Sequence, residues 1–482
     1  MNLRIILKIF GLLVILIGFA MVPSFLWCWH YDEPDLTAFF YSIIICLFSG
    51  IIMFRLNYNI AGKILLREAF FIVGFGWIIA GLFGSLPFML SGVLPDFFDA
   101  FFETVSGFTT TGSSVIKDVE IIGKGILFWR SFTHWLGGMG IIVLFVALFP
   151  FLGVGGRNLM NFESPGPVKS GIKPKTVDTA RYLWYIYFGF TCIEIILLLI
   201  CGMGLFDSLC HTFGTMATGG FSTLNKSVGG FNNKYIDVII TFFMIFAGMN
   251  FSLYYNLIHG NFKNFFKDTE FKAYMSIIIF STLSMTAILY FNNYYPTILS
   301  STRYAFFQVV SILTTTGYAT ADFNLWPSFC KILFLVLMFI GGCAGSTGGG
   351  MKVIRIVILL KFAWQQLFRT IYPNAVVTLK LEKQPFPKHT LFQILGFFVF
   401  AIIIFIIGSL FVSLYNFDIE TSLSAVAATL WNIGPGLAKV GAIENFAFFP
   451  SPVKFVLSIF MIIGRLELFT ILVFFSPAFW KK

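Results

Sequence analysis

The sequence TTTG at residues 314–317 interrupts a long apolar background, and three related stretches do the same elsewhere in the chain. They are TTTG at 109–112, ATGG at 217–220 and NIGPG at 432–436. With Gly112, Gly219, Gly317 and Gly434 as anchors, the stretches lie roughly a hundred residues apart, which indicates an internal repeat. Four copies of one unit in a single chain predict a pseudo-four-fold assembly around an axis.

The composition places this assembly in a membrane. Of the 482 residues, 58% are hydrophobic and only 11% are charged, against roughly 25% charged in soluble domains. A bilayer, and not a water-excluded core, then sets the lengths of the elements. The apolar segments long enough to cross a bilayer are 5–28, 36–56, 67–92, 124–150, 181–205, 235–258, 271–291, 328–371, 389–415 and 452–477.

A shorter amphipathic segment leads into each glycine stretch: 96–109, 207–217, 299–314 and 419–430. These segments are too short to span a bilayer, so we predict re-entrant pore helices. Asp96, Asp207 and Asp418 lie at their starts, where a carboxylate suits the positive end of a helix dipole.

The repeating unit is therefore a span, a short helix, a glycine stretch and a second span. The expected fold is an all-α polytopic membrane protein, with four such units around a pseudo-four-fold pore. Two extra N-terminal transmembrane helices precede them within residues 1–60. We place the units at 61–160, 161–262, 263–375 and 376–482.

The distribution of charge predicts the orientation. Most of the 32 Lys and Arg residues fall in the N-terminus, alternate loops and the C-terminus, and positive loops stay cytoplasmic, so both termini should be inside. The other side carries acidic residues such as Asp118, Glu120 and Asp322. These form either an outer rim that concentrates cations or ordinary solvated loops. The seven cysteines, which show no C-x-x-C pattern, indicate buried thiols.

The glycine stretches suit a site that strips water from a cation. Non-helical backbone at membrane depth must be buried in protein or line water, and rings of backbone carbonyls replace the hydration shell of potassium. No carboxylate occurs in the four stretches, so an acid-ring filter for calcium or sodium is not indicated. Helix breaks that only accommodate packing are the alternative. The candidate ion-binding residues are Thr110, Thr111, Gly112, Thr218, Gly219, Thr315, Thr316, Gly317, Asn432, Ile433 and Gly434.

The sequence GGCAGSTGGG at 341–350 lies midway along the apolar segment 328–371. A continuous helix of that length would far exceed a bilayer of about 30 Å. We predict a break or flexible loop at membrane depth that blocks the path below the third glycine stretch; close helix crossing is the plainer alternative. A phosphate loop is not indicated, because Lys352 is followed by Val353. The candidate gate residues are Gly341, Gly342, Gly345, Ser346, Thr347, Gly348, Gly349, Gly350 and Arg465.

Arg465 belongs to this set because it lies near the centre of the last span, where a charge is costly and usually faces a partner in the bundle interior. Near the axis it could hold the carbonyls of the loop and repel cations. The alternative is a buried pair with an acid such as Glu194. Arg130 and His134 are expected to cap or pin the second span of the first unit. No catalytic or metal-binding pattern is evident, so we expect neither an enzyme nor a cofactor.

Together, residues 109–113, 134–140, 217–223, 314–320, 341–355, 432–436 and 464–468 resemble the Trk/Ktr/HKT superfamily of potassium transporters. The extra N-terminal spans resemble the Trk branch. The resemblance implies a homodimer in the cell inner membrane with a pore in each protomer, and a TrkA-like cytosolic ring that binds nucleotide and gates the pore. It also implies that the loop at 341–350 is the gate and that Arg465 secures it. Ser113 and Ser114 depart from the family pattern, which bears on fine selectivity.

These observations favour potassium uptake with channel-like permeation. A sodium- or proton-coupled symporter on the same fold is the first alternative, with Glu194 or Glu467 as the only evident intramembrane acids. The second is a polytopic enzyme acting on lipid, which would need acids or histidines clustered at one interface. We expect membrane lipid, and no nucleic acid, as a further partner.

Overall fold

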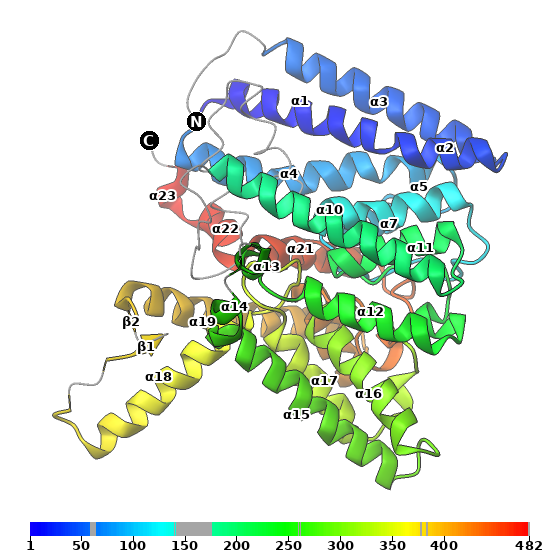
Figure 1. Ribbon diagram of the computed structural model, residues 1–482. Coiled ribbons are helices and arrows are strands. Elements are labelled where there is room, and N and C mark those ends of the chain that lie inside the picture. Colours follow the sequence, from blue (N-terminus) through cyan, green and yellow to red (C-terminus); the bar gives the residue numbers. More distant parts are fainter. Residues whose placement is uncertain are drawn as a thin grey trace.

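The computed structural model describes residues 1–57, 64–138, 140, 176–258, 260, 262–375, 378–381 and 384–480, and it is mostly helical (Figure 1). Six of the described helices are long and apolar enough to cross a membrane, or up to eight if each of two bent pairs counts as one span. The second half of the span expected at 124–150, and the basic loop that follows it, lie outside the described residues.

The two extra N-terminal spans form a tight pair at one edge of the molecule (Figure 1). α1 (Leu3–Ala20) continues into α2 (Val22–His30) and packs along α3 (Leu36–Arg55). Gly11 and Gly50 lie at the crossing, where a Cβ on Gly11 would be 2.7 Å from the Gly50 carbonyl oxygen. The pair therefore approaches closely because both helices carry small residues at the contact.

A buried carboxylate ties this pair to the first unit. Glu68, which is 2% exposed, accepts hydrogen bonds from the backbone N–H groups of Asn2 (2.7 Å) and Leu65 (2.9 Å). It thereby satisfies donors at the starts of two helices, which have no intrahelical partner.

The predicted short helices are present: α6 (Phe97–Phe108), α11 (Leu205–Ala217), α16 (Ile298–Leu313) and α20 (Ile419–Leu430). Asp96 and Asp418 cap α6 and α20 by accepting backbone N–H groups. Asp207 lies in the first turn of α11, where its carboxylate accepts the hydroxyl of Thr223 at 2.6 Å. Thr297 caps α16.

Longer helices flank each short one. The helices before them are α4 (Leu66–Gly84) with α5 (Leu86–Leu90), α10 (Thr176–Ile200), α15 (Thr269–Phe291) and α19 (Lys388–Ser413). The helices after them are α7 (Lys124–Gly138), α12 (Lys234–Ala247), α17 (Ser328–Ile340) and α21 (Ser451–Leu466). The order of elements therefore follows the expected repeating unit.

Three of the second spans are broken. The break between α17 and α18 (Val353–Ile371) is the predicted glycine loop. The other two correct our expectation of continuous spans at 235–258 and 452–477. α13 (Phe251–Ile258) leaves α12 at 94°, and the segment that begins with α22 (Leu468–Leu472) leaves α21 at 114°. Apolar composition conceals these bends. At the first one, the Phe251 N–H and the Gly248 carbonyl form hydrogen bonds with Gly345 and Cys343 of the glycine loop.

The remaining elements are short connections. They are η2 (Ser227–Phe231), α14 (Phe262–Lys267), η3 (Phe323–Leu325), β1 (Lys380–Leu381), β2 (Gln384–Pro385), η4 (Ala438–Val440), η5 (Val473–Phe475) and α23 (Pro477–Trp480). β1 and β2 pair antiparallel. α18 projects away from the body of the molecule with β1 and β2 beside it, while α1 begins and α23 ends at one end of the bundle (Figure 1).

The close approach of α1 and α3 can be tested with Gly50→Leu. The larger side chain would meet Ile15 and the backbone of Gly11, and overpacking of this kind destabilises by about 1–3 kcal/mol. We expect a lower thermal unfolding midpoint of the detergent-solubilised protein. Gly189→Leu is the control, because a Cβ at Gly189 has nothing within 4 Å. Equal midpoints for the two variants would contradict the packing described.

Candidate functional site

The four glycine stretches meet end to end in a closed ring. In each stretch, a Cβ added to one glycine would run into a carbonyl oxygen of the next stretch. The contacts run from Gly112 to Gly219, from Gly220 to Thr316, from Gly317 to Ile433, and from Gly434 back to Thr111. The fourth stretch thus touches the first, and the ring has no gap.

The four stretches share one backbone conformation. At the end of each short helix, one residue has a positive φ: 56° at Thr110, 55° at Thr218, 63° at Thr315 and 55° at Asn432. Thr218 is itself the C-cap of its helix, whereas the other three residues follow the C-cap directly. A glycine two residues later is also positive, at 84°, 81°, 82° and 99°. Positive φ is uncommon outside glycine, and such strain clusters at functional sites. Four repetitions of it indicate one structure built four times.

This shared conformation corrects the register of the second stretch. The residue equivalent to Gly112, Gly317 and Gly434 is Gly220, not the anchor Gly219 that we chose from the sequence. Gly219 corresponds to Thr111. The stretch contains two consecutive glycines, and only the backbone angles reveal which one takes the left-handed conformation.

The corrected register makes the carbonyls in the ring equivalent. The oxygens that lie against neighbouring glycines belong to Thr111, Gly219, Thr316 and Ile433, which is the same position in all four stretches. A side chain at the glycine would displace its neighbour's carbonyl, so glycine is required there for close approach.

Several side chains of the stretches bind other protein groups. The hydroxyls of Thr109 and Thr111 lie 2.8 Å apart, and those of Thr314 and Thr316 repeat this contact at 2.8 Å. Asn432 donates through Nδ2 to the Thr111 hydroxyl at 2.8 Å. These contacts brace the ring from behind and across units.

We expected Arg130 and His134 to cap or pin the second span of the first unit. In the structure these two residues also brace the ring. Arg130 pairs with buried Glu103 of α6 (Nε to Oε1, 2.6 Å) and donates to the Ser222 carbonyl at 3.0 Å. Its guanidinium also lies 3.5 Å from the centroid of the Phe221 ring. Arg130 thus joins the first pore helix to the residues that follow the second glycine stretch.

His134 makes a similar bridge. Its Nδ1 lies 2.8 Å from the Gly107 carbonyl, and its Nε2 lies 3.3 Å from the Phe221 backbone nitrogen. Because Nε2 accepts a backbone N–H, the proton belongs on Nδ1, which donates to Gly107. The histidine therefore connects the end of α6 to the second stretch. Its position before a glycine-rich helix end was the only sequence signal of this role.

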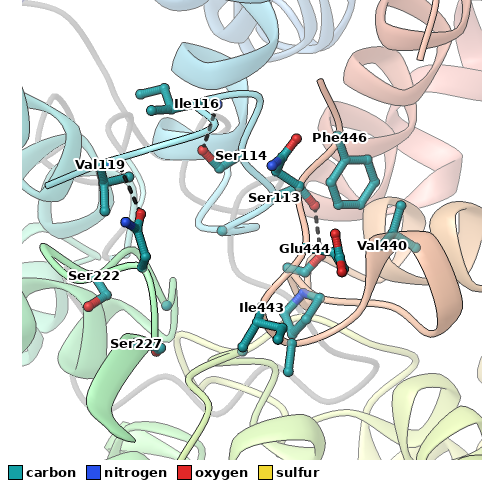
Figure 2. A pocket seen from close by; sticks show the side chains of 18 of the residues that line it. Ser113, Ser114, Ile116, Val119, Ser222, Ser227, Val440, Ile443, Glu444 and Phe446 are labelled. Atoms are coloured by element: carbon teal, nitrogen blue, oxygen red, sulfur yellow. Dashed lines mark hydrogen bonds between the residues drawn. The ribbon is translucent and has the colours of Figure 1, made fainter. Parts of the chain in front are cut away.

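A cavity of about 110 Å³ opens above the ring (Figure 2). Its lining includes Gly112, Gly220, Gly317 and Gly434, one equivalent glycine from each unit. Ser113, Ser114, Ser222 and Ser227 add polar side chains, and Glu444 adds a carboxylate. The cavity is therefore a polar mouth centred on the ring.

The outer acids, which the sequence assigned either to an outer rim or to ordinary solvated loops, have protein partners. Asp118 accepts the side-chain amide of Asn225 at 2.7 Å, and Glu120 accepts the Asn225 backbone N–H at 3.0 Å. Asp99 pairs with Lys454 at 2.6 Å. Glu444 was missed by the sequence reasoning because it follows the fourth stretch in a loop without acidic neighbours.

The glycine loop lies directly beneath the ring and forms hydrogen bonds with the second, third and fourth units. Thr347 donates its hydroxyl to the Met216 carbonyl (3.0 Å) at the end of α11. The Gly349 N–H donates to the Thr315 hydroxyl (2.6 Å), and the Gly350 N–H to the Trp431 carbonyl (3.1 Å). The first unit is reached through Arg465. The loop therefore contacts the C-terminal ends of three pore helices.

Arg465 joins the loop to the first unit. Its NH1 group donates to the Thr347 carbonyl at 2.8 Å and to the Thr110 hydroxyl at 3.1 Å. NH2 donates to the Gly138 carbonyl at 2.9 Å and also to that of Gly137. The last carbonyls of a helix have no intrahelical partner and favour a cation. Arg465 thus caps α7 and holds the loop at once.

Charged residues that the sequence analysis did not assign surround this loop. Lys352 is buried with a φ of 78° and donates Nζ to the Gly348 carbonyl. Arg355 pairs with Glu467 at 2.7 Å, and Glu467 occupies the bend between α21 and α22. Basic residues placed immediately after a glycine break at membrane depth were the signal that could have identified Lys352 and Arg355.

A mostly helical membrane protein, with a closed carbonyl ring between a polar mouth and a loop, falls in the class of cation transport proteins. The sequence model of the TrkH family, described as "Cation transport protein", matches residues 37–482. The chain belongs to the TrkH family. It is therefore a transporter and not an enzyme, and potassium is the transported ion.

The relatives extend over the full chain. The Trk system potassium uptake protein TrkH of Salmonella typhimurium is 40% identical, with 100% of both chains covered. TrkG of Escherichia coli is 31% identical over 100% of this chain and 99% of its own length. The crystal structure of the potassium transporter TrkH from Vibrio parahaemolyticus matches with a TM-score of 0.90 at 37% identity, covering 100% of both chains. The resemblance noted from the motifs is confirmed.

The ring can be tested with Gly317→Ala. The added Cβ would collide with the Ile433 carbonyl, in a backbone with a φ of 82°. We expect the potassium-to-sodium flux ratio in proteoliposomes to fall roughly tenfold, equivalent to about 1.4 kcal/mol of lost discrimination.

Gly92→Ala is the matched control for this variant. Gly92 has a similar φ of 77°, but a Cβ there has nothing within 4 Å. It therefore introduces backbone strain without touching the ring. An unchanged flux ratio in Gly317→Ala would remove the ring from consideration as the selectivity filter.

Proposed function

We propose that this protein takes up potassium across the cell inner membrane by channel-like permeation through the glycine ring. The observation that carries the proposal is the set of four equivalent carbonyl oxygens, from Thr111, Gly219, Thr316 and Ile433, in a closed ring. Potassium sheds its water when carbonyl oxygens replace it. An ion enters the polar mouth, gives up water to the ring and leaves toward the cytoplasm.

The ring needs rigid support to act as a filter. The Arg130–Glu103 pair and the bridging His134 join neighbouring units directly behind it. Groups held in place by packing and hydrogen bonds do not have to reorganise when an ion arrives. This bracing supports preference for potassium over smaller cations, and Gly220 joins the proposed filter residues.

The loop at 341–350 acts as the gate in this proposal. It lies under the ring and is held by hydrogen bonds to the ends of pore helices and by Arg465. Ions pass when the loop moves aside. The described state, with these bonds made, corresponds to a closed gate.

We propose that a cytosolic partner controls the gate. The relatives are named as proteins of a Trk system, and the family resemblance points to a TrkA-like ring that binds nucleotide. The same resemblance supports a homodimer with a pore in each protomer. Both termini are proposed to be cytoplasmic, with the four units bounded at 61–160, 161–262, 263–375 and 376–482.

Arg465→Ala tests the gate. The variant removes the bonds from Arg465 to Thr347 and to the end of α7, and each bond from a charged donor contributes about 1.5–3 kcal/mol. We expect potassium flux through partner-free proteoliposomes to rise at least roughly tenfold. Shortening 341–350 should have the same effect.

Arg303→Ala is the control for loss of an arginine. Arg303 lies on α16, away from the loop, and pairs with Asp237 at 3.5 Å. Its removal should leave partner-free flux unchanged. Flux that stays at the wild-type level in both the Arg465 and the shortened-loop variants would show that the loop is not the gate.

A coupled symporter is the second candidate, and one observation favours it. Glu194 is fully buried on α10, and none of the ion pairs found among the described residues includes it. Intramembrane acids often belong to proton or ion relays. Coupling predicts that potassium uptake depends on an imposed sodium or proton gradient and that Glu194→Gln abolishes this dependence. Channel-like uptake predicts that potassium flux follows its own electrochemical gradient alone.

A further inference from the structure

We infer that Glu270 is the latch of the glycine loop, a positioning residue that holds the loop closed and ties it to the cytoplasmic connection between the second and third units. The inference rests on the proposed gate and concerns its regulation. Glu270 lies in the first turn of α15, far in sequence from the loop and from Arg465.

One carboxylate oxygen holds both sides of the loop. Oε1 of Glu270 accepts the backbone N–H of Ala344 at 2.7 Å and that of Ile354 at 3.0 Å. Ala344 lies within the loop, and Ile354 lies in the first turn of α18. Helix-start N–H groups lack intrahelical partners and favour a negative charge. The carboxylate is buried, so water competes little for these bonds.

The same part of the loop is held from the opposite side by the bend after α12. The Phe251 N–H donates to the Gly345 carbonyl at 3.0 Å, and the Cys343 N–H donates to the Gly248 carbonyl at 2.9 Å. Residues 343–345 therefore lie between the start of α13 and the start of α15. α13 ends the second unit and α15 begins the third, so both helices border the connection between these units.

This connection is one packed body. The Phe265 ring of α14 lies 4.8 Å from that of Phe271 on α15 and 6.5 Å from that of Tyr254 on α13. Next to it, Phe266 is 62% exposed. The positive-inside rule places this connection, with Lys267 and Lys272, on the cytoplasmic side. A cytosolic partner that displaces this body would pull directly on residues 343–345.

Two residues thus secure the loop from different parts of the structure. Arg465 secures Thr347 from within the membrane, whereas Glu270 secures Ala344 from the cytoplasmic connection. Release of the Glu270 bonds detaches the first half of the loop from α15, so that only the hydrogen bonds to the bend after α12 hold residues 343–345. The ring and its bracing stay intact. The latch is therefore expected to affect how often the pore opens and not which ion passes.

The test measures potassium flux in partner-free proteoliposomes for Glu270→Ala, Glu270→Gln and Arg465→Ala. Glu270→Ala removes the acceptor of both bonds, so flux should rise roughly tenfold or more with an unchanged potassium-to-sodium ratio, because bonds to a charged group are among the stronger ones. Glu270→Gln keeps a carbonyl oxygen at the same place and should restore flux to near the wild-type level. Glu68→Ala is the matched control, since Glu68 also accepts two backbone N–H groups but lies far from the loop.

A second readout follows the loop itself. Cys343 is a buried free thiol in the loop, and Cys210 is a buried free thiol on α11. Thiol labelling from the cytoplasmic side, mapped by mass spectrometry, should become roughly tenfold faster at Cys343 in Glu270→Ala. Labelling of Cys210 should not change.

The outcomes separate the latch from the gate. If Arg465→Ala raises flux and Glu270→Ala does not, the latch is wrong and the gate stands. If neither raises flux, the gate itself is wrong. If Cys210 labelling rises together with that of Cys343, Glu270 stabilises the fold as a whole, and the proposal that it is a latch is wrong.

Discussion

The structure depends on a contact that only glycine permits, in which one unit's glycine lies against the carbonyl of the next. It is made four times, and it closes a ring in a region where unpaired backbone would be very costly. A Cβ at any of these positions would push the neighbouring carbonyl away. The ring in turn demands short helices that end there, spans that hold them, and bracing behind them.

The bracing is charged because the ring joins units that have no hydrophobic reason to associate within lipid. Glu103 and Arg130 form a buried ion pair between the first pore helix and the span after it, and the arginine reaches on to the second unit. Such pairs add little net stability compared with apolar packing but fix geometry. A filter needs fixed geometry more than it needs stability.

In our proposal the region below the ring is built to move, in contrast to the rigid ring. Three second spans are broken, and the loop between α17 and α18 is held mainly by hydrogen bonds to helix ends. These bonds can be exchanged without unfolding any helix. Arg465 and Glu270 hold the loop from different sides, so a rigid ring lies above a segment whose hold can be released in steps.

The sequence by itself determined the membrane class, the short helices and the central break, because hydropathy, helix caps and glycine runs are local signals. It also predicted the division into four units. It also identified Arg465, since an intramembrane charge stands out. Only the tertiary structure decided which glycine of the second stretch joins the ring, where α12 and α21 bend, and that Glu270 meets the loop. These features depend on contacts between segments far apart in the chain. A backbone angle or a long-range hydrogen bond produces no recognisable pattern in the sequence of the residues that form it.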